Sequence, residues 1–274
     1  MNWFDLWTIH LINFFSHHWW ITDAIIVQIA NNDFIDGGIL MALFWWAWIE
    51  HGKENPEKRE ILAVNLFVTA FAVIVARLLA LSLPYRDRPF SNPLLHFQVP
   101  YTSNPEKLIH WSSFPSDHAV LTFCVVAGLW MVSRRLGMLA AAYGLLTNLA
   151  RVYSGAHYST DVAAGLVLGV GMAFLCRISS LKKVARTALN ILDQQPAYLY
   201  ALLFACTFEI AEMFDSLRHI TVFGARATML LSPGAVVAAA IPLLAMLLGM
   251  LAWLRLRSRK KQAMIDEFSS TQAR

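Results

Sequence analysis

The chain has 274 residues, of which 57% are hydrophobic and only 15% are charged, and its net charge is +4. A soluble domain carries about 25% charged residues, so this composition excludes an ordinary soluble globular protein. The modest positive charge gives no reason to expect a nucleic-acid partner. The hydrophobic residues form long blocks, and the block 61–84 holds a single charge, that of Arg77. Because a membrane-spanning helix needs about 20 mostly apolar residues, the sequence predicts an all-α, polytopic membrane helical bundle.

Residues 1–33 precede the first apolar block and are rich in tryptophan, with Trp3, Trp7, Trp19 and Trp20. This pattern favours an N-terminal amphipathic segment in the membrane interface, and one further, poorly formed span is the alternative. After it we expect a transmembrane core over 34–178, two additional helices over 179–261 and a polar tail over 262–274. The seven expected spans are 34–50, 61–84, 117–134, 137–153, 158–178, 197–221 and 234–255.

Basic residues in the connecting segments predict the orientation of the spans. They cluster in four segments that strict alternation places on one side: 51–60, 133–137, 177–186 and 255–261. Short loops rich in lysine and arginine stay in the cytoplasm. We therefore expect the loops 85–116, 151–158 and 222–233 to face the extracytoplasmic side.

Three span ends bring polar side chains to this second side. Their shared feature is chemistry that suits phosphate: two histidines, a carboxylate and several arginines. An arginine guanidinium binds oxyanions through paired hydrogen bonds, and histidine can act as nucleophile, acid or base. The residues are Arg86, Arg88, Ser116, His118, Arg151, His157 and Asp161.

The pattern resembles the type 2 phosphatidic acid phosphatase (PAP2) superfamily, whose site is related to that of vanadium haloperoxidases. The family signatures are Lys-x6-Arg-Pro, Pro-Ser-Gly-His and Ser-Arg-x5-His-x3-Asp. Residues 151–161 match the third, with Ala150 in place of its leading serine. Residues 115–118 match the second, with Asp117 in place of glycine. Residues 88–89 match only the final Arg-Pro of the first.

The lysine of the first signature is replaced by Leu81. Arg77 lies one helical turn earlier on the same face, and Arg86 lies in the loop beside Arg88. We favour Arg77 as the substitute, because an arginine within an apolar span needs a polar partner. Asp117 adds a negative charge beside the expected phosphate, although its backbone N–H can bind an oxygen and its carboxylate can cap the helix.

The resemblance implies a mechanism through a phosphohistidine. His157 would attack phosphorus, Asp161 would orient it, and His118 would protonate the leaving group and then activate water. The resemblance implies no metal and no cofactor. The groups expected to bind the phosphate oxygens are Arg88, Arg151, Ser116, the backbone of Asp117, and Arg77 or Arg86.

The implied protein is an integral-membrane lipid phosphate phosphatase, with its site on the extracytoplasmic face of a bacterial inner membrane. Its partners would be membrane lipids and a lipid phosphate such as polyprenyl diphosphate, phosphatidate or phosphatidylglycerophosphate, with no nucleic acid. One alternative is a lipid phosphotransferase of the same fold. The other is a non-enzymatic transporter of anions or lipids.

Three carboxylates in the expected span 197–221 fall outside all the signatures. Glu209, Glu212 and Asp215 would be costly in lipid. They could face the site and take part in substrate selection or gating, pair with an arginine, or mark a span that starts later.

Overall fold

The structure, a computed structural model, describes residues 2–52, 55–104, 108 and 111–215. All regular elements in this part of the chain are helices. Residues 1–214 form one compact unit. The predicted span 234–255 and the tail 262–274 lie outside the described residues.

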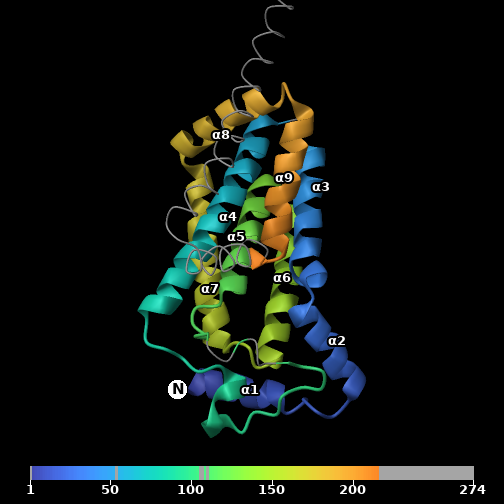
Figure 1. The fold of residues 1–274 in the computed structure, drawn as a ribbon, viewed down its shortest axis with the longest axis vertical. Coiled ribbons are helices and arrows are strands. Elements are labelled where there is room, and N and C mark those ends of the chain that lie inside the picture. Colours follow the sequence, from blue (N-terminus) through green and yellow to red (C-terminus); the bar gives the residue numbers. More distant parts are fainter. Residues whose placement is uncertain (1, 53–54, 105–107, 109–110, 216–274) are drawn as a thin grey trace, which may run out of the picture. The chain divides into compact units, whose positions relative to one another are not determined.

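Four long helices form the centre of this unit, and α5 packs against each of the other three (Figure 1). Close packing of α5 on α7 depends on two glycines, because small residues let helix backbones approach closely. A Cβ at Gly165 would lie 2.6 Å from the carbonyl oxygen of Ser116, and one at Gly169 would lie 2.4 Å from that of Val120. The four helices are α4 (Pro56–Ser82), α5 (Asp117–Val132), α6 (Arg134–Tyr153) and α7 (Ser159–Ala173).

The remaining expected spans within the described residues correspond to helices with shifted ends. A π-helical turn, η1 (Phe34–Gly38), leads into α3 (Ile39–Gly52), and α9 (Pro196–Ala211) ends ten residues before the expected end at 221. Glu212 and Asp215 therefore lie beyond the end of α9. Two described segments, α4 and 159–177, are long and apolar enough to cross a membrane.

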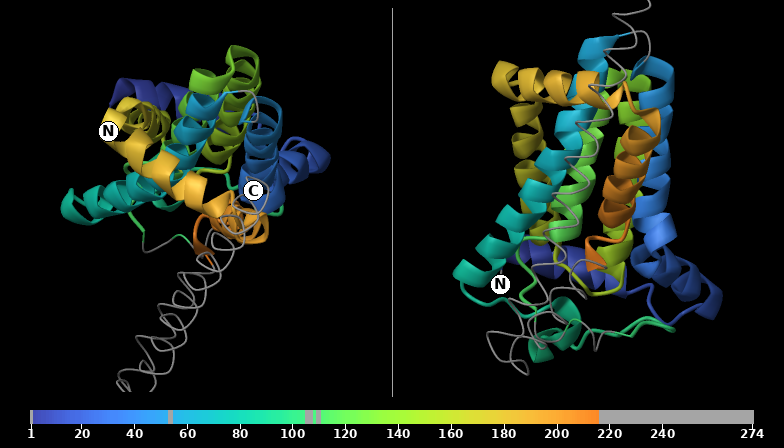
Figure 2. Two further views of the ribbon diagram at one scale, coloured as in Figure 1. Left: turned by 90° about the horizontal axis from the view of Figure 1, so that it is seen from above. Right: turned by 45° about the horizontal axis from the view of Figure 1, so that its top comes forward.

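Two connections differ from expectation. The basic loop predicted at 133–137 is a single residue, because α5 ends at Val132, Ser133 caps it, and α6 begins at Arg134. The segment expected as a loop after 178 contains a helix, α8 (Ser179–Leu192), which crosses one end of the bundle (Figures 1 and 2). In α8 the apolar Leu189 is buried while Lys183 is exposed, so the helix is amphipathic and not continuously apolar, which is why hydropathy alone missed it.

The N-terminal segment forms α1 (Trp3–Asn13) and α2 (Trp20–Asn31), and α1 runs across the opposite end of the bundle from α8 (Figure 1). One face of α1 is buried on the bundle, with Asp5 fully buried. The other face is aromatic, with Trp3 75% and Trp7 58% exposed. The helix α1 therefore has one face buried on the bundle and one exposed aromatic face, and its place in a membrane interface stays a prediction.

Candidate active site

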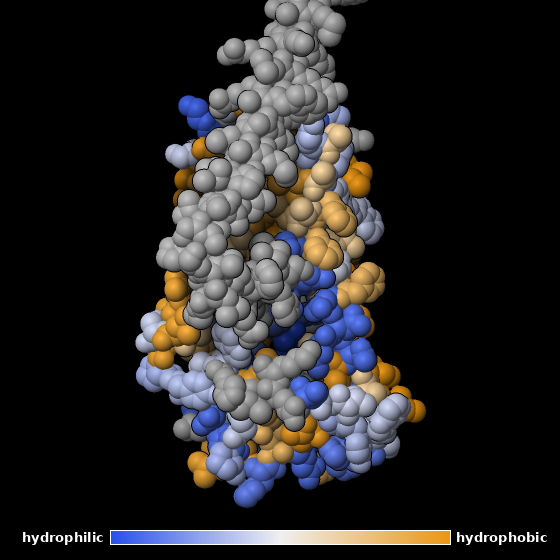
Figure 3. Space-filling view, in the orientation of Figure 1, coloured by the Kyte–Doolittle hydropathy of each residue, from blue (hydrophilic) through white to orange (hydrophobic). Residues whose placement is uncertain are grey.

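The candidate site lies where α5 and α7 begin and α6 ends, on the side of the bundle that α1 crosses (Figure 1). A tight turn at 154–158 joins α6 to α7. Gly155 in this turn has a φ of +77°, a conformation that favours glycine, and a Cβ there would lie 2.5 Å from the ring of Phe97. Figure 3 shows hydrophilic residues in a hollow on the lower part of the visible face.

His157 follows this turn and is only 2% exposed. Its Nδ1 lies 2.9 Å from the carbonyl oxygen of Ser113. Because a carbonyl only accepts hydrogen bonds, Nδ1 carries the proton and Nε2 keeps its lone pair. The Nε2 atom lies 3.5 Å from Nη1 of Arg88. The atom suited to nucleophilic attack therefore points at a cation.

The electrostatic surroundings keep His157 neutral. Burial lowers the pKa of its imidazole, Asp161 partly offsets this effect, and the charge of Arg88 lowers the pKa further. The resulting pKa lies below the ordinary histidine value, so the ring remains unprotonated and nucleophilic at neutral pH.

Asp161 lies beside His157, as the role implied by the third signature requires, but the contact is looser than a hydrogen bond. Its Oδ2 is 3.8 Å from Nδ1 of His157 and accepts a hydrogen bond of 2.8 Å from the backbone of Tyr158. Its Oδ1 accepts from Arg86. Asp161 is fully buried, and its bond from the backbone of Tyr158 fixes the carboxylate at the start of α7.

His118 reaches the same place from the first turn of α5. One ligand atom each of Asp117, His118 and His157 lies within 4.8 Å of the others. The Nδ1 of His118 is 3.1 Å from Oδ1 of Asp117, and its Nε2 is 3.7 Å from Oδ2 of Asp36. Such a set could bind a cation. However, Arg88 beside His157 makes the space between the two histidines better suited to an anion.

Arg88 is held at the centre of the site by backbone carbonyls. It donates to Trp111 at 3.1 Å, to Ala156 at 2.7 Å and to Ser112 at 3.4 Å. Burial lowers the pKa of its guanidinium, but the ordinary value is so high that the group stays charged. The charge of Arg88 is therefore fixed next to Nε2 of His157.

Arg151 approaches from the last turn of α6 and is 7% exposed. Its Nη2 donates to Oδ2 of Asp36 at 2.6 Å. Its Nε is buried and has no hydrogen-bond partner among the described residues. A buried donor without a partner is costly, so a bound oxyanion would satisfy it.

Asp36 was not identified from the sequence. It lies in η1, more than a hundred residues from Arg151, and no signature covers it. An aspartate at the start of the apolar block 34–50 was the available signal, because carboxylates in spans usually have a polar partner.

The two arginines that could replace the family lysine, Arg77 and Arg86, have different partners in the structure. Nη2 of Arg77 lies 3.6 Å from Oδ2 of Asp117, the residue before His118. Arg86 instead donates to Asp5 and Asp161 and lies over the ring of Tyr158, 4.1 Å from its centroid. Each Nη group of Arg86 therefore hydrogen-bonds to a carboxylate.

Ser116 is fully buried at the N-cap of α5, and its Oγ accepts a hydrogen bond of 3.3 Å from the backbone of Ala119. Its side chain therefore caps the helix, while the N-terminus of α5 and its dipole face the two histidines.

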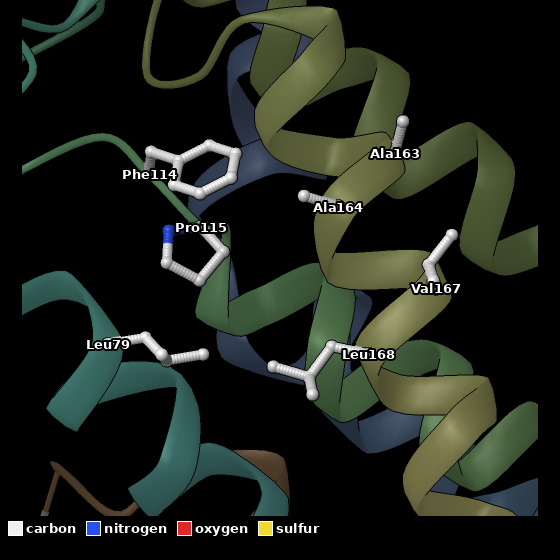
Figure 4. Close-up of a pocket in the computed structure, with 7 residues that line it drawn as sticks. All are labelled: Leu79, Phe114, Pro115, Ala163, Ala164, Val167 and Leu168. Atoms are coloured by element: carbon white, nitrogen blue, oxygen red, sulfur yellow. The ribbon is translucent and has the colours of Figure 1, made fainter. Parts of the chain in front are cut away.

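An apolar pocket of about 470 Å³ lies beside the site, between α4 and α7 (Figure 4). This volume is within the range of ligand-binding cavities. Its floor includes Pro115, the residue immediately before Ser116, so the pocket adjoins the start of α5. The lining residues are Leu79, Phe114, Pro115, Ala163, Ala164, Val167 and Leu168.

Comparison with known proteins gives three bacterial relatives. The chain is 26% identical over 160 residues to the undecaprenyl-diphosphatase BcrC of Bacillus subtilis (strain 168), covering 58% of this chain and 76% of that protein. It is 28% identical over 171 residues to the lipid A 1-diphosphate synthase of Escherichia coli (strain K12), covering 56% and 68%. It is 31% identical over 125 residues to the bacitracin transport permease protein BcrC of Bacillus licheniformis, covering 45% and 56%.

Among solved structures, LpxE of Aquifex aeolicus aligns with a TM-score of 0.45 and 21% identity, covering 62% of this chain and 92% of that chain. A phosphatidylglycerolphosphate phosphatase of Bacillus subtilis aligns with a TM-score of 0.43 and 18% identity, covering 63% and 82%. Residues 61–185 match the family model of the PAP2 superfamily, and this match includes all three signature segments. This part of the chain, which supplies every signature residue of the candidate site, belongs to the PAP2 superfamily.

Proposed function

We propose that the protein is an integral-membrane lipid phosphate phosphatase that works through a phosphohistidine on His157. The observation that carries the proposal is the convergence of His118 and His157, whose ligand atoms lie within 4.8 Å, next to the buried guanidinium of Arg88. A pair of histidines with a fixed cation supplies a nucleophile, an acid and charge neutralisation in one place.

In the first step, the lone pair on Nε2 of His157 forms a bond to phosphorus. The bond from phosphorus to the leaving oxygen breaks, and that oxygen takes a proton from His118. The carbonyl of Ser113, 2.9 Å from Nδ1, holds the ring while it gains positive charge. Asp161, 3.8 Å away, stabilises that charge.

In the second step, water attacks the phosphohistidine and gives a proton to His118, which is then neutral. The bond from nitrogen to phosphorus breaks and its electrons return to Nε2 of His157. Inorganic phosphate leaves, and both histidines regain their starting protonation states. The net reaction consumes one water for each phosphate released.

Three arginines are proposed to bind the phosphate oxygens. Arg88 is already beside the nucleophile, and the Nε of Arg151 is a buried donor without a partner among the described residues. Arg77 is the proposed substitute for the family lysine, because its guanidinium lies 3.6 Å from Asp117 at the site. The carboxylate of Asp117 would turn away from the bound phosphate, leaving its backbone N–H at the helix N-terminus to bind an oxygen.

The Arg77→Gln variant is expected to raise KM for a lipid phosphate by about tenfold to a hundredfold, because it removes a charge-assisted hydrogen bond to the substrate. Steady-state phosphate release measures this. The matched control is Arg59→Gln at the far end of the same helix, where Arg59 pairs with Asp193 at 2.5 Å. Equal KM values for the Arg77 variant and the parent would exclude Arg77 as a phosphate ligand.

The apolar pocket between α4 and α7 is proposed to accept the lipid tail. Its lining is apolar and it adjoins the start of α5, so a lipid entering sideways would present its phosphate to the histidines. The wider membrane architecture of six to seven spans belongs to the same proposal. So does a site on the extracytoplasmic face, which the basic residues at the opposite end support.

Filling this pocket with Ala164→Phe is expected to raise KM for a long-chain lipid phosphate roughly tenfold by excluding part of the tail. A water-soluble short-chain analogue should keep its parent KM. The control is Ala142→Phe, which adds the same ring at an exposed position of α6. If both chain lengths lose affinity equally, the pocket does not bind the tail.

A panel of lipid phosphates would identify the substrate class. Purified protein would be given undecaprenyl diphosphate, phosphatidate and phosphatidylglycerophosphate, with release of inorganic phosphate as the readout. Similarity to a protein named undecaprenyl-diphosphatase makes polyprenyl diphosphate the first choice. No phosphate release from any lipid by the correctly inserted protein would refute the proposed phosphatase.

A second candidate is phosphoryl transfer, in which a lipid hydroxyl replaces water in the second step. Similarity to a protein named lipid A 1-diphosphate synthase favours including it. Transfer predicts a phosphorylated lipid acceptor in place of free phosphate. Non-enzymatic transport, the remaining alternative, predicts binding or movement of a lipid phosphate that does not depend on His157.

A further inference from the structure

The N-terminal helix α1 places a buried carboxylate against the catalytic turn. Asp5 is fully buried, although carboxylates are rarely buried without partners. Its Oδ1 accepts from the backbone of Thr160 at 3.0 Å, and its Oδ2 accepts from the Thr160 hydroxyl at 2.7 Å and from Arg86 at 2.6 Å. Asn2 donates a further bond of 2.9 Å. Hydrogen bonds from Thr160 and Arg86 outweigh the effect of burial and lower the pKa of this carboxyl.

Arg86 connects this carboxylate to the one beside the nucleophile. One branch of its guanidinium donates to Asp5, and the other donates to Oδ1 of Asp161 and, at 3.0 Å, to the hydroxyl of Thr160. The plane lies over the ring of Tyr158. The three charged groups therefore form a chain from Asp5 through Arg86 to Asp161. Both Nη groups of Arg86 are therefore engaged in this chain.

The contacts converge on the residues that immediately follow His157. Tyr158, Thr160 and Asp161 are all bound by this network, and the hydroxyl of Ser159 donates to Thr8 of α1 at 2.9 Å. The first turn of α7 is thus bound by α1 on one side. His157 precedes that turn directly, so any shift of the turn would move Nε2.

We propose that Asp5 and Arg86 are positioning residues, which hold the first turn of α7 and Asp161 so that His157 is aligned for attack. This inference rests on the proposed function and extends it to a helix that lies outside the residues matched by the family model. Nucleophile alignment is sensitive, because a displacement of about 1 Å can cost a hundredfold in rate. Neither residue is proposed to touch the substrate.

The test separates positioning from phosphate binding. Asp5→Asn and Arg86→Gln are expected to lower kcat for lipid phosphate by about tenfold to a hundredfold while KM stays within twofold of the parent. Arg86→Lys keeps the charge but loses the two-branched geometry, so its kcat should lie between those of the parent and Arg86→Gln. A large rise in KM with unchanged kcat for Arg86→Gln would assign Arg86 to the phosphate site and overturn the proposal.

Asp23→Asn is the matched control, because Asp23 is also a fully buried carboxylate of the N-terminal segment. It accepts hydrogen bonds from the backbones of His17 at 3.1 Å and Tyr101 at 3.0 Å and from the hydroxyl of Tyr153. Within the described part of the chain, it makes no hydrogen bond to the turn that follows His157. Its kcat should stay within threefold of the parent. If Asp5→Asn and Asp23→Asn lower kcat equally, Asp5 only attaches the segment and the proposal fails.

Orthovanadate binding, measured by calorimetry on the same proteins, tests the inference without turnover. Vanadate mimics the five-coordinate phosphorus of attack, so Asp5→Asn should weaken it about tenfold or more while inorganic phosphate binds as to the parent. If the parent binds vanadate but hydrolyses no lipid phosphate, the proposed function is refuted. The difference in vanadate affinity between the parent and Asp5→Asn then still tests the role of Asp5. A parent that binds no vanadate would overturn both proposals, and equal vanadate affinity in the parent and Asp5→Asn would overturn this one.

Discussion

Replacing His157 with asparagine is expected to lower kcat for lipid phosphate hydrolysis by about 10⁴-fold or more, because the nucleophile is lost. The asparagine amide can occupy the place of Nδ1 and donate to the carbonyl of Ser113, which lies 2.9 Å from Nδ1 in the parent. The fold of the turn should therefore survive. Phosphate release and retention of a labelled phosphoryl group on the protein are the two measurements.

The labelled phosphoryl group gives this prediction a chemical signature. A bond from histidine nitrogen to phosphorus is cleaved by acid and survives alkali, so the label on the parent should follow that pattern. The His157→Asn protein should carry no label. Full turnover in a correctly inserted His157→Asn protein, or an acid-stable label on the parent, would contradict the assignment of His157 as nucleophile.

Replacing His118 with asparagine is expected to lower kcat by about 10²- to 10⁴-fold for a lipid phosphate, because the leaving alkoxide is no longer protonated. The effect on the first step should depend on the leaving group. With p-nitrophenyl phosphate, whose phenolate needs no proton, the variant should form phosphohistidine almost as fast as the parent. It should then hydrolyse this intermediate slowly, because His118 also activates the water.

A burst of p-nitrophenolate followed by slow turnover is therefore the expected result for His118→Asn, measured by rapid mixing. His157→Asn serves as the control and should show no burst. Equal slowing of both leaving groups in the first step would show that His118 is not the acid. The 4.8 Å convergence of the two histidines is the geometric basis for assigning these complementary roles.

The positions of the helices show where the local sequence predicted the structure and where it did not. The starts of α5 and α7 were predicted to within one residue, because Ser116 caps the first and the apolar block after Tyr158 begins the second. The helix α8 was missed because its alternation of lysine and apolar residues resembles a basic loop when only hydropathy is considered. The predicted end of α9 was too late, because the helix ends at Ala211 and the backbone of Met213 and Phe214 then takes positive φ values.

The two candidate arginines show a limit of a different kind. Periodicity placed Arg77 on a usable face of α4, and the structure puts it 3.6 Å from Asp117. For Arg86, in a loop, no periodicity applied, and its partner Asp5 lies 81 residues away. A flexible side chain in a loop can reach several partners, so only the folded arrangement selects among them.

The sequence by itself pointed to the PAP2 superfamily and predicted the chemistry of the candidate site, because the signature residues are few and their spacing along the chain is characteristic. It also predicted helices, which the described part of the chain confirms, since long apolar blocks leave little choice. Only the tertiary structure decided that Asp36 pairs with Arg151, that Arg86 binds Asp5 and Asp161, and that an apolar pocket adjoins the start of α5. These contacts join segments far apart in the chain, and each depends on how the helices pack, which local patterns do not encode.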